Sequence, residues 1–383
     1  MYANFVKHPF MSRAALEHFS AAALTRAMLR FELALADAEE AHGALPAGTH
    51  DALDARLRDH VFDLDALEAG VAQGGNVAIP FVQQARQALP EELRQYFHVA
   101  ATSQDVVDSA LMLLTRERLP VMLELADRAR RAMLALMETH VDTPMIGRTL
   151  MQQAMPMTFG VKVAQWAVGL EQGAQRLREI IDGGLYVQFG GPVGVQAGLE
   201  DGLAVMTTLA EKLGLITPAL PWHTDRQPIH ALITALDAVA CGAEKIAVDI
   251  ALLTQSEIGE VREPAGEGMG ASSSMPHKRN PVRCALIRTA ARQIHGHTAT
   301  IINATAQPLE RALGEWHAEW APLIETQALL EGALEQLVVT LEGLEVIPEA
   351  MQRNLAAAGT GGTAELGSSR AQVARVQAML ARG

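Results

Sequence analysis

The sequence predicts an all-α protein built around a bundle of long helices. Hydrophobic residues make up 49% of its 383 residues but aromatic residues only 4%, so Ala, Leu, Val and Met must fill most of the core. Apolar residues recur at helical spacing, whereas the alternation of a half-buried strand is scarce. Several helical stretches exceed the usual length in globular proteins, which is typical of a bundle of long helices.

The first part of the chain is predicted to hold one longer helix followed by short ones. Residues 19–41 carry Ala, Leu and Met at helical spacing with charged residues between them, which is typical of an amphipathic helix. Residues 51–89 continue in helical pieces that Gly74-Gly75 and Pro80 interrupt.

The long helices are expected in the middle of the chain. They are predicted at 105–139, 157–182, 229–262, 281–303 and 319–343. The segments between them are rich in glycine, proline and polar residues and are interpreted as loops. After Pro348 the chain turns small and polar before a last short helix. The sequence thus predicts an N-terminal helical domain (1–101), a central long-helix bundle domain (102–345) and a short C-terminal tail or domain (346–383).

The charge and the cysteine content exclude several kinds of partner and compartment. A net charge of −13 argues against nucleic acid or an anionic membrane as a partner, because both require a basic face. The two cysteines, Cys241 and Cys284, cannot by themselves form a disulfide framework or a zinc site, which favours a reducing compartment. No segment has about 18 uncharged apolar residues in a row, and the N-terminus lacks the pattern of a signal peptide. We therefore expect a soluble, cytoplasmic protein.

The segment ASSSMPHKRNP, residues 271–281, interrupts the helical pattern with hydroxyl and cationic side chains. It follows a glycine-rich run, and Asn280 and the proline after it suit the cap and first turn of the next helix. Free N–H groups and the positive end of that helix would lie beside Ser272 and Lys278, where a carboxylate or an oxyanion can bind. Residues 268–309 contain no Asp or Glu, although the protein is acidic. A solvated basic surface behind a disordered linker is the alternative interpretation.

Two further breaks place hydrogen-bond donors beside helices. Thr102 and Asp105 have the spacing of a capping box, and a plain helix cap is the simpler interpretation of this pair. Arg148, Thr149 and Gln152 cluster donors in an apolar context, and buried hydrogen bonding between helices is the alternative there. Three donor-rich breaks with few acids among them favour one shared site for a small polycarboxylate.

These segments resemble the active-site segments of the fumarase/aspartase superfamily. SSSMPHKRNP is similar to its signature loop, which usually reads Gly-Ser-Ser-x-Met-Pro-x-Lys-x-Asn-Pro. TSQD and GRTLMQQAMPMTFG resemble its other two segments, and the resemblance extends over residues 1–345. Within the superfamily, PWHTDR (221–226) and ERALGEWHAEW (310–320) resemble the cycloisomerases that lactonise 3-carboxy-cis,cis-muconate in protocatechuate breakdown.

The resemblance implies an all-helical subunit in a homotetramer, with each active site built from three subunits. It implies neither a metal nor an organic cofactor. Position by position, it implies that Ser272 transfers the proton and that Lys278 and Asn280 bind a carboxylate and order the loop. It implies substrate contacts for the residues that match the remaining segments: Thr102, Ser103, Arg148, Thr149, Gln152 and Arg226.

Four positions depart from the superfamily's usual pattern. Leu150 stands where lyases and fumarases usually have a histidine that handles the leaving or attacking group. Ala271 stands where a glycine is usual, which restricts the loop. In the superfamily an Asp-Arg pair often follows the position of Arg226. This chain has Gln227-Pro228 there, so any role of that second arginine has no counterpart in this sequence.

The missing histidine is consistent with lactonisation. Eliminating an amine or hydroxide requires a general acid, and adding water requires a general base. Lactonisation requires neither, because the nucleophile is a carboxylate of the substrate that is already ionised at neutral pH. One proton must then reach carbon, which is the role that the resemblance implies for Ser272. We therefore expect conversion of 3-carboxy-cis,cis-muconate to 4-carboxymuconolactone. A histidine from elsewhere, such as His98, His223 or His317, is the alternative that would permit a lyase.

Two other functions stay open. One is a lyase of the same superfamily that releases fumarate from a succinyl substrate such as adenylosuccinate. The other is a scaffold or storage protein that keeps the fold without the activity, although the presence of Ser272 and Lys278 argues against it.

The remaining features are interpreted as structural. The Met-rich segment 145–157 is expected to fill the core, and Trp316 and Trp320 to pack against neighbouring helices. His295 and His297 are two residues apart, so on a helix they face different ways and are interpreted as surface residues.

Overall fold

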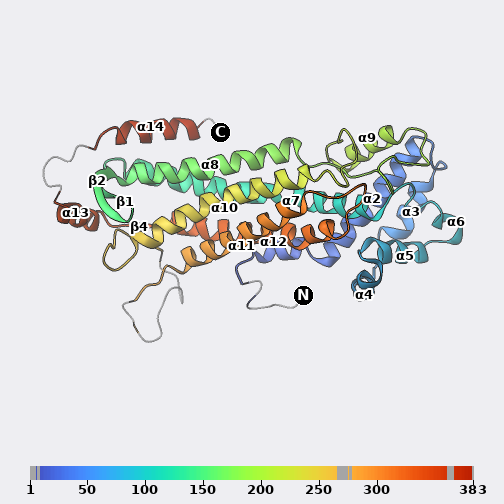
Figure 1. Cartoon of the computed structure of the whole chain (residues 1–383), viewed down its shortest axis with the longest axis horizontal. Helices are drawn as coiled ribbons and strands as arrows, with labels where there is room; N and C mark the ends of the chain where they lie inside the picture. Colours follow the sequence, from blue (N-terminus) through green and yellow to red (C-terminus); the bar gives the residue numbers. More distant parts are fainter. Residues whose placement is uncertain (1–5, 7–8, 265–274, 276–277, 360–365, 382–383) are drawn as a thin grey trace.

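The computed structural model of the chain describes residues 6, 9–264, 275, 278–359 and 366–381. These residues form an elongated bundle of long helices, with smaller helices gathered at one end and short strands at the other (Figure 1). The bundle helices are α7 (Ser103–Thr139), α8 (Phe159–Gly183), α10 (Gln227–Leu253), α11 (Val282–Ala304) and α12 (Glu315–Glu342). The prediction of an all-α protein with a long central bundle is confirmed. Among the helices described, none is both long enough and apolar enough to cross a membrane.

Small and aliphatic side chains hold the bundle together. Its helices bury mainly Ala, Leu, Ile, Val and Met where they contact one another, as the low aromatic content predicts. The backbones of α8 and α10 approach closely at Gly173 and Gly242. A Cβ atom added at Gly173 would lie 2.8 Å from the carbonyl oxygen of Ala238, and one at Gly242 would lie 2.9 Å from the Cα of Leu170. A larger residue at either position would push the two helices apart.

The helices that precede the bundle are α1 (Arg13–His18), α2 (Ala21–Ala41), α3 (Thr49–Leu57), α4 (Leu64–Gly74), α5 (Ala78–Ala88) and α6 (Glu91–Arg94). They pack against the bundle, most of them at one of its ends, while α1 packs against α12 (Figure 1). Gly75 ends α4 with a left-handed φ of +76°, as predicted. The predicted break at Pro80 is wrong, because Pro80 lies in the first turn of α5, where a helix needs no N–H donor.

Helix α9 (Gly202–Leu213), between α8 and α10, is absent from the predicted elements. Its boundary signals are nevertheless present in the sequence. Asp201 accepts a hydrogen bond from the Ala204 N–H at 3.0 Å, and Gly214 ends the helix with a φ of +65°.

Within the described residues, short strands lie at the other end of the bundle (Figure 1). β1 (Pro144–Thr149) and β2 (Gln152–Thr158) form an antiparallel hairpin, and β3 (Val261–Arg262) pairs with β4 (Glu345–Val346). The structure has this hairpin where the sequence predicts a loop. The strands escape prediction because a register irregularity between Ile146 and Arg148 disrupts the simple alternation of a strand. The chain then forms α13 (Pro348–Ala357) and α14 (Ser369–Leu380), and α14 packs along α8.

Two predicted helix boundaries are also wrong. The helix predicted at 229–262 ends at Leu253, because the chain turns at Gly259, with a φ of +60°, and continues as β3. The helix predicted at 319–343 begins at Glu315 and contains Pro322 in its interior. The division of the chain into three domains stays a prediction.

Candidate active site

The residues predicted to bind substrate lie at two opposite ends of the bundle. Thr102 and Ser103 are at the start of α7, whereas Arg148 is in the hairpin that follows its end. The 37 residues of α7 span about 55 Å at a rise of about 1.5 Å per residue. We call these regions the Thr102 end and the hairpin end.

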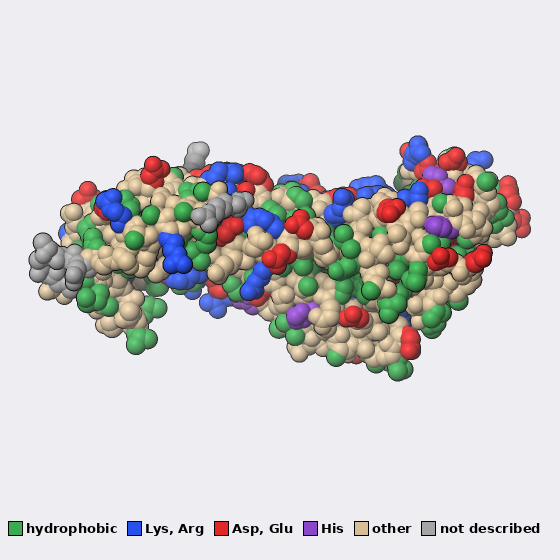
Figure 2. All heavy atoms as spheres, turned by 90° about the horizontal axis from the view of Figure 1, so that it is seen from above, with side chains coloured by type: hydrophobic (Ala, Val, Ile, Leu, Met, Phe, Trp, Pro, Cys, Tyr) green, Lys and Arg blue, Asp and Glu red, His purple; other side chains and the backbone are tan. Residues whose placement is uncertain are grey.

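One face of the molecule carries charged side chains of both signs between these ends. Figure 2 shows Lys and Arg interspersed with Asp and Glu along the bundle, and acidic side chains gathered where the small helices lie. The net charge of −13 is therefore compatible with local cationic sites on the bundle.

At the Thr102 end, two hydroxyl groups stand at the first turn of a long helix. Thr102 is the N-cap of α7 and Ser103 its first residue, and both are partly exposed. The Asp105 carboxylate accepts a hydrogen bond from the Thr102 N–H at 2.9 Å, so the predicted capping box is confirmed. The positive end of the helix beside these hydroxyls favours an anion.

Asp105 is the centre of the hydrogen bonds at this end. Its buried carboxylate accepts from the N–H groups of Gly190 and Gly191 at 3.0 and 2.9 Å. It also accepts from Nε2 of His223 at 2.6 Å. One carboxylate thus fixes the start of α7, the glycine loop between α8 and α9, and the segment before α10 relative to one another.

Arg226 lies inside the bundle, where it joins three helices. Its side chain is 1% exposed, and it donates to Asp108 of α7 at 2.7 Å and to Glu319 of α12 at 2.6 Å. The guanidinium also stacks on the ring of Trp222, 4.7 Å from the ring centroid. Burial lowers the pKa of Arg226, but the two carboxylates outweigh burial and raise it. The predicted contact between Arg226 and substrate gains no support from this placement.

Arg311 is a second cation at the Thr102 end, and it is absent from the predicted site. Its guanidinium donates to the side chain of Gln104 and, at 3.1 Å, to the carbonyl oxygen of Pro192. Burial lowers the pKa of Arg311, and this outweighs the opposing effect of Asp105 and Asp108. The only sequence signal was its place in the segment ERALGEWHAEW.

The two tryptophans of that segment pack as predicted. Trp316 is buried, its ring meets that of Trp320 edge-on with centroids 4.8 Å apart, and its Nε1 donates to Asp108 at 2.9 Å.

Of the three histidines considered as substitutes for the missing one, two have buried partners. His98 Nδ1 bonds Glu32 at 2.6 Å, and His223 bonds Asp105. His317 is exposed on the first turn of α12, beside the two tryptophans. His317 is therefore the one of the three that is open to a ligand.

At the hairpin end, an apolar turn separates two polar side chains. Leu150 and Met151 both have positive φ values, +48° and +63°, which makes a two-residue turn of a kind that normally takes Asn-Gly. Leu150 is 97% exposed. Thr149 and Gln152 are exposed as well and face each other across the hairpin. Bulky residues in this conformation are strained, which is typical of a functional site.

The Met-rich segment 145–157 fills the core only in part. Met145 is fully buried, but Met151 and Met155 are 74% and 70% exposed. The predicted packing role is wrong for these two residues, because Met151 lies in the hairpin turn and Met155 on the solvent-facing side of β2.

Arg148 is held in place by a buried carboxylate. Its two terminal nitrogens donate to the two oxygens of Glu260 at 3.0 and 2.7 Å. Asn354 of α13 donates to the same carboxylate at 2.7 Å. Arg148 is therefore oriented before any substrate arrives.

A cavity of about 830 Å³ lies at the hairpin end, between the end of α10, the segment of β3 and residues 278–281. Lys278 and Asn280 line it together with Glu257, Arg262 and Glu263. Lys278 is exposed. Its lining carries cationic and acidic side chains, and its size suits a small molecule.

The start of α11 differs from the prediction in two ways. Its N-cap is Pro281 rather than Asn280. The N–H groups of Arg283 and Cys284, predicted to be free for substrate, donate to the Glu263 carboxylate at 3.1 and 2.8 Å. An acid twenty residues earlier in the chain folds back to cap the helix, which helical periodicity does not reveal. Ser272 and Ala271 lie outside the described residues.

The histidines on α11 face different helices, as predicted, but they are not plain surface residues. His295 bonds Asp237 of α10 at 2.6 Å, and His297 pairs with Glu325 of α12 at 3.3 Å. Both side chains lie partly buried between helices.

Comparisons with known proteins identify a family, relatives and a solved structure that are similar to this chain. A lyase family model matches residues 9–296. A protein named 3-carboxy-cis,cis-muconate cycloisomerase, from Pseudomonas aeruginosa, is 43% identical over 350 residues, which cover 90% of this chain and 76% of that protein. Nitrosuccinate lyase from Streptomyces davaonensis is 39% identical over 348 residues, 88% of this chain and 73% of that protein. The crystal structure of 3-carboxy-cis,cis-muconate lactonizing enzyme from Pseudomonas putida matches with a TM-score of 0.91 and 33% identity over 99% of both chains.

Proposed function

The chain belongs to the fumarase/aspartase superfamily of lyases, and we propose that it converts 3-carboxy-cis,cis-muconate to 4-carboxymuconolactone. It would act as an intramolecular lyase in the breakdown of protocatechuate. The relative at 43% identity and the solved structure at a TM-score of 0.91 both carry the name of this reaction. The cytoplasm is the expected location, with a small polycarboxylate as the substrate and no nucleic acid or membrane as a partner.

Leu150 is the observation that carries the choice of reaction. Its exposed side chain occupies the hairpin tip, between the polar pair Thr149 and Gln152. A leucine there transfers no proton, whereas a lyase that expels an amine requires a general acid. A reaction whose nucleophile is already ionised has no such requirement.

The reaction then proceeds by internal addition. A carboxylate oxygen of the substrate forms a bond to an alkene carbon, and the π electrons move toward the neighbouring carboxyl group as an aci-carboxylate. Ser272 would deliver one proton to the adjacent carbon, which restores that carboxylate and leaves the lactone. The serine regains a proton from solvent, so the ionised substrate takes up one proton overall and the enzyme is left unchanged.

The cationic and hydroxyl side chains would hold the substrate's other carboxylates. Lys278 and Asn280 line the cavity at the hairpin end, and Arg148 is bound to Glu260, the neighbour of the lining residue Gly259. Thr102 and Ser103 supply hydroxyls at the positive end of α7. These donors lower the barrier by stabilising the charge that develops on the aci-form.

A complete site requires more than one copy of the chain. The two groups of donors in one chain are separated by the length of α7, about 55 Å, far more than a small polycarboxylate spans. The Thr102 end of one copy would meet the hairpin end of another in a homotetramer. We assign Arg226 to positioning, because its donors already bind Asp108 and Glu319.

Turnover of two substrates, 3-carboxy-cis,cis-muconate and adenylosuccinate, tests this function. Purified protein mixed with 3-carboxy-cis,cis-muconate should remove the conjugated-diene absorbance and form 4-carboxymuconolactone, identified by NMR. Ser272→Ala should reduce the rate by about 10²- to 10⁴-fold, the usual contribution of a positioned proton donor. His317→Asn is the matched comparison, and its rate should stay close to that of the natural protein.

Three results would contradict the proposal. Release of fumarate from adenylosuccinate without lactonisation would identify a lyase. Undiminished turnover by Ser272→Ala would remove Ser272 from proton transfer. A rate loss in His317→Asn as large as that expected for Ser272→Ala would show that a histidine moves the proton. Circular dichroism and size-exclusion chromatography of each variant should match the natural protein.

A further inference from the structure

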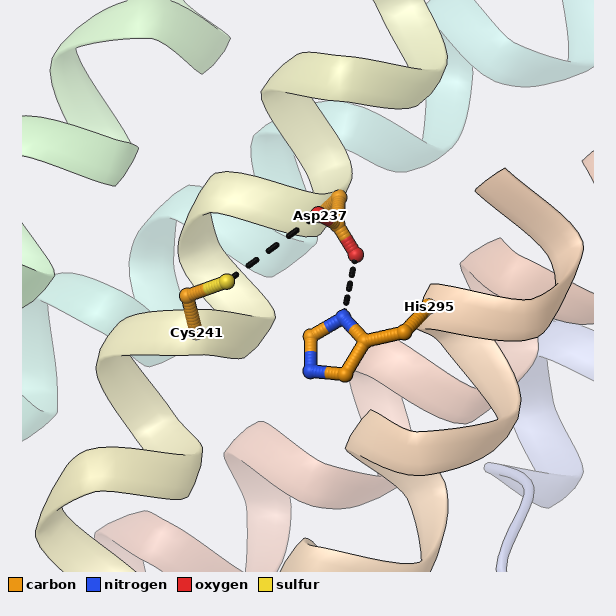
Figure 3. Close-up of side chains that lie close together, drawn as sticks. All are labelled: Asp237, Cys241 and His295. Carbon is orange, nitrogen blue, oxygen red and sulfur yellow. Dashed lines mark hydrogen bonds and ion pairs between the residues drawn. The ribbon is translucent and has the colours of Figure 1, made fainter. Parts of the chain in front are cut away.

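Three side chains of different chemistry converge between α10 and α11, in the middle of the bundle. Asp237 and Cys241 are one turn apart on α10, and His295 reaches them from α11 (Figure 3). Nδ1 of His295 lies 2.6 Å from Oδ1 of Asp237, and Sγ of Cys241 lies 4.0 Å from Oδ2 of the same carboxylate. One ligand atom from each of the three lies within 4.8 Å of the others.

We propose that Asp237, Cys241 and His295 bind a divalent transition-metal ion, with Zn²⁺ as the best fit. A sulfur, an imidazole nitrogen and a carboxylate oxygen form the donor set that Zn²⁺ and Co²⁺ prefer, whereas Mg²⁺ and Ca²⁺ take oxygen ligands. Three protein ligands leave a fourth, open position for water.

Only small movements would close the site around an ion. With zinc bond lengths of about 2.0 to 2.3 Å in a tetrahedron, the nitrogen and oxygen ligands lie about 3.4 Å apart and the sulfur and oxygen about 3.6 Å apart. The present separations of 2.6 and 4.0 Å each differ from these values by less than the radius of a methyl group. Side-chain rotation within the two helices suffices for such shifts.

Glu244 supplies the outer support that metal-binding histidines usually have. It lies on the same face of α10, two turns from Asp237, and its Oε2 is 3.2 Å from Nε2 of His295. A proton on Nε2, donated to Glu244, leaves the lone pair of Nδ1 directed toward Asp237. This carboxylate–histidine–metal order selects the tautomer that a ligand requires.

The surroundings favour a cation. The carboxylates of Asp237 and Glu244 lie 2.6 and 3.2 Å from the two ring nitrogens of His295. Arg292, 3.8 Å from Glu244, is a nearby positive charge, and it contacts the outer carboxylate rather than a ligand. Two carboxylates and a thiolate would therefore surround the ion, with one arginine outside them.

The scaffold is firm enough to hold a fixed geometry. Gly242, next to Cys241, has its backbone against that of Leu170 in α8, which fixes the stretch of α10 that carries two of the ligands. Asp237 is ten residues from the start of α10, about 15 Å along the helix from the buried Arg226 network. The ion would join α10 to α11 and take no part in lactonisation.

Cobalt binding tests the site directly, because Co²⁺ bound to a thiolate gives a charge-transfer absorbance. Full-length protein dialysed against a chelator and titrated with Co²⁺ should show this band, saturating at one Co²⁺ per chain, and Zn²⁺ should abolish it. Cys241→Ser should lose the band and keep its lactonisation rate. Cys284→Ala, which removes the only other thiol of the chain, is the matched control and should keep the band.

A second variant tests the supporting role of Glu244, which is not itself a ligand. Glu244→Gln should keep the stoichiometry but weaken Co²⁺ binding about 10- to 100-fold, the usual effect of losing an outer partner. The absence of the band at saturating Co²⁺, or a band that persists in Cys241→Ser, would overturn the proposal. Unchanged affinity in Glu244→Gln would overturn the role of Glu244. Circular dichroism of each variant controls for folding.

Discussion

The burial of Arg226 distinguishes between two roles, substrate binding and internal ion pairing, that the sequence alone does not distinguish. An arginine in a polar segment of an enzyme is equally suited to bind a substrate carboxylate or to pair inside the protein. Here Asp108 and Glu319 already occupy its guanidinium, and both carboxylates are almost fully buried. Removing the arginine would strand two buried charges, so its main contribution is to hold three helix starts in register.

Glu39 is a buried acid whose protonation should shape the pH dependence of stability. Its side chain is 1% exposed, and burial, together with Glu32, raises its pKa from 4.5 to about 9. Between these two pH values the folded protein keeps a proton on Glu39 that the unfolded chain releases. The free energy of unfolding should therefore fall as pH rises through this window, by up to about 1.4 kcal/mol per pH unit from this group.

Thermal unfolding of Glu39→Gln measures this effect, since glutamine does not titrate. The variant's Tm should decline less steeply than that of the natural protein between pH 4.5 and about 9, and the two curves should diverge as pH rises. Parallel curves would show that Glu39 is ionised in the folded protein.

Among the elements, the β1–β2 hairpin carries an unfavourable turn. Leu150 and Met151 hold left-handed conformations that cost a side-chain-bearing residue about 1 kcal/mol or more each. The double substitution Leu150→Asn with Met151→Gly should raise the free energy of unfolding by about 1 kcal/mol, because it restores the preferred turn sequence. The lactonisation rate should fall, because the apolar tip is lost from the proposed site.

Urea denaturation and the lactonisation assay together check this expectation. Leu309→Gly is a matched control, because Leu309 is also exposed and has a φ of +52°, but lies in another loop. It should gain similar stability. A double variant that is more stable and equally active would exclude the hairpin tip from the active site.

Long helices were predictable because their apolar period persists over many turns. The ends of α7 and α11 agree with prediction to within two residues, since capping and loop residues mark them. The hairpin was missed because its strands are short and irregular. The early end of α10 was missed because a two-residue pairing between β3 and β4, far apart in sequence, causes it.

The candidate site was predictable in its residue types but not in its connections. Motif resemblance identified Thr102, Arg148 and Lys278. It could not reveal that Glu263 caps α11 or that Glu260 orients Arg148, because both contacts join segments remote in sequence. The roles of Lys278 and Arg148 in binding substrate stay predictions.

At the scale of the whole molecule, the proposal of a site shared between copies depends on the length of the bundle. Helix α7 separates the Thr102 end from the hairpin end, and under the proposed function each end of one chain supplies only part of a site. A variant damaged at one end keeps the other end intact. If the site is shared as proposed, two differently damaged chains should restore a complete site when they assemble together.

Mixing two inactive variants tests this claim most directly. One carries Ser103→Ala with Thr102→Ala, the other Lys278→Met, and each alone should have little lactonising activity. After the two are unfolded and refolded together, activity should rise well above the sum of the separately refolded variants, because some mixed assemblies contain one site with both ends intact. Activity that stays at that sum, while size-exclusion chromatography shows mixed assemblies, would contradict a site shared between copies.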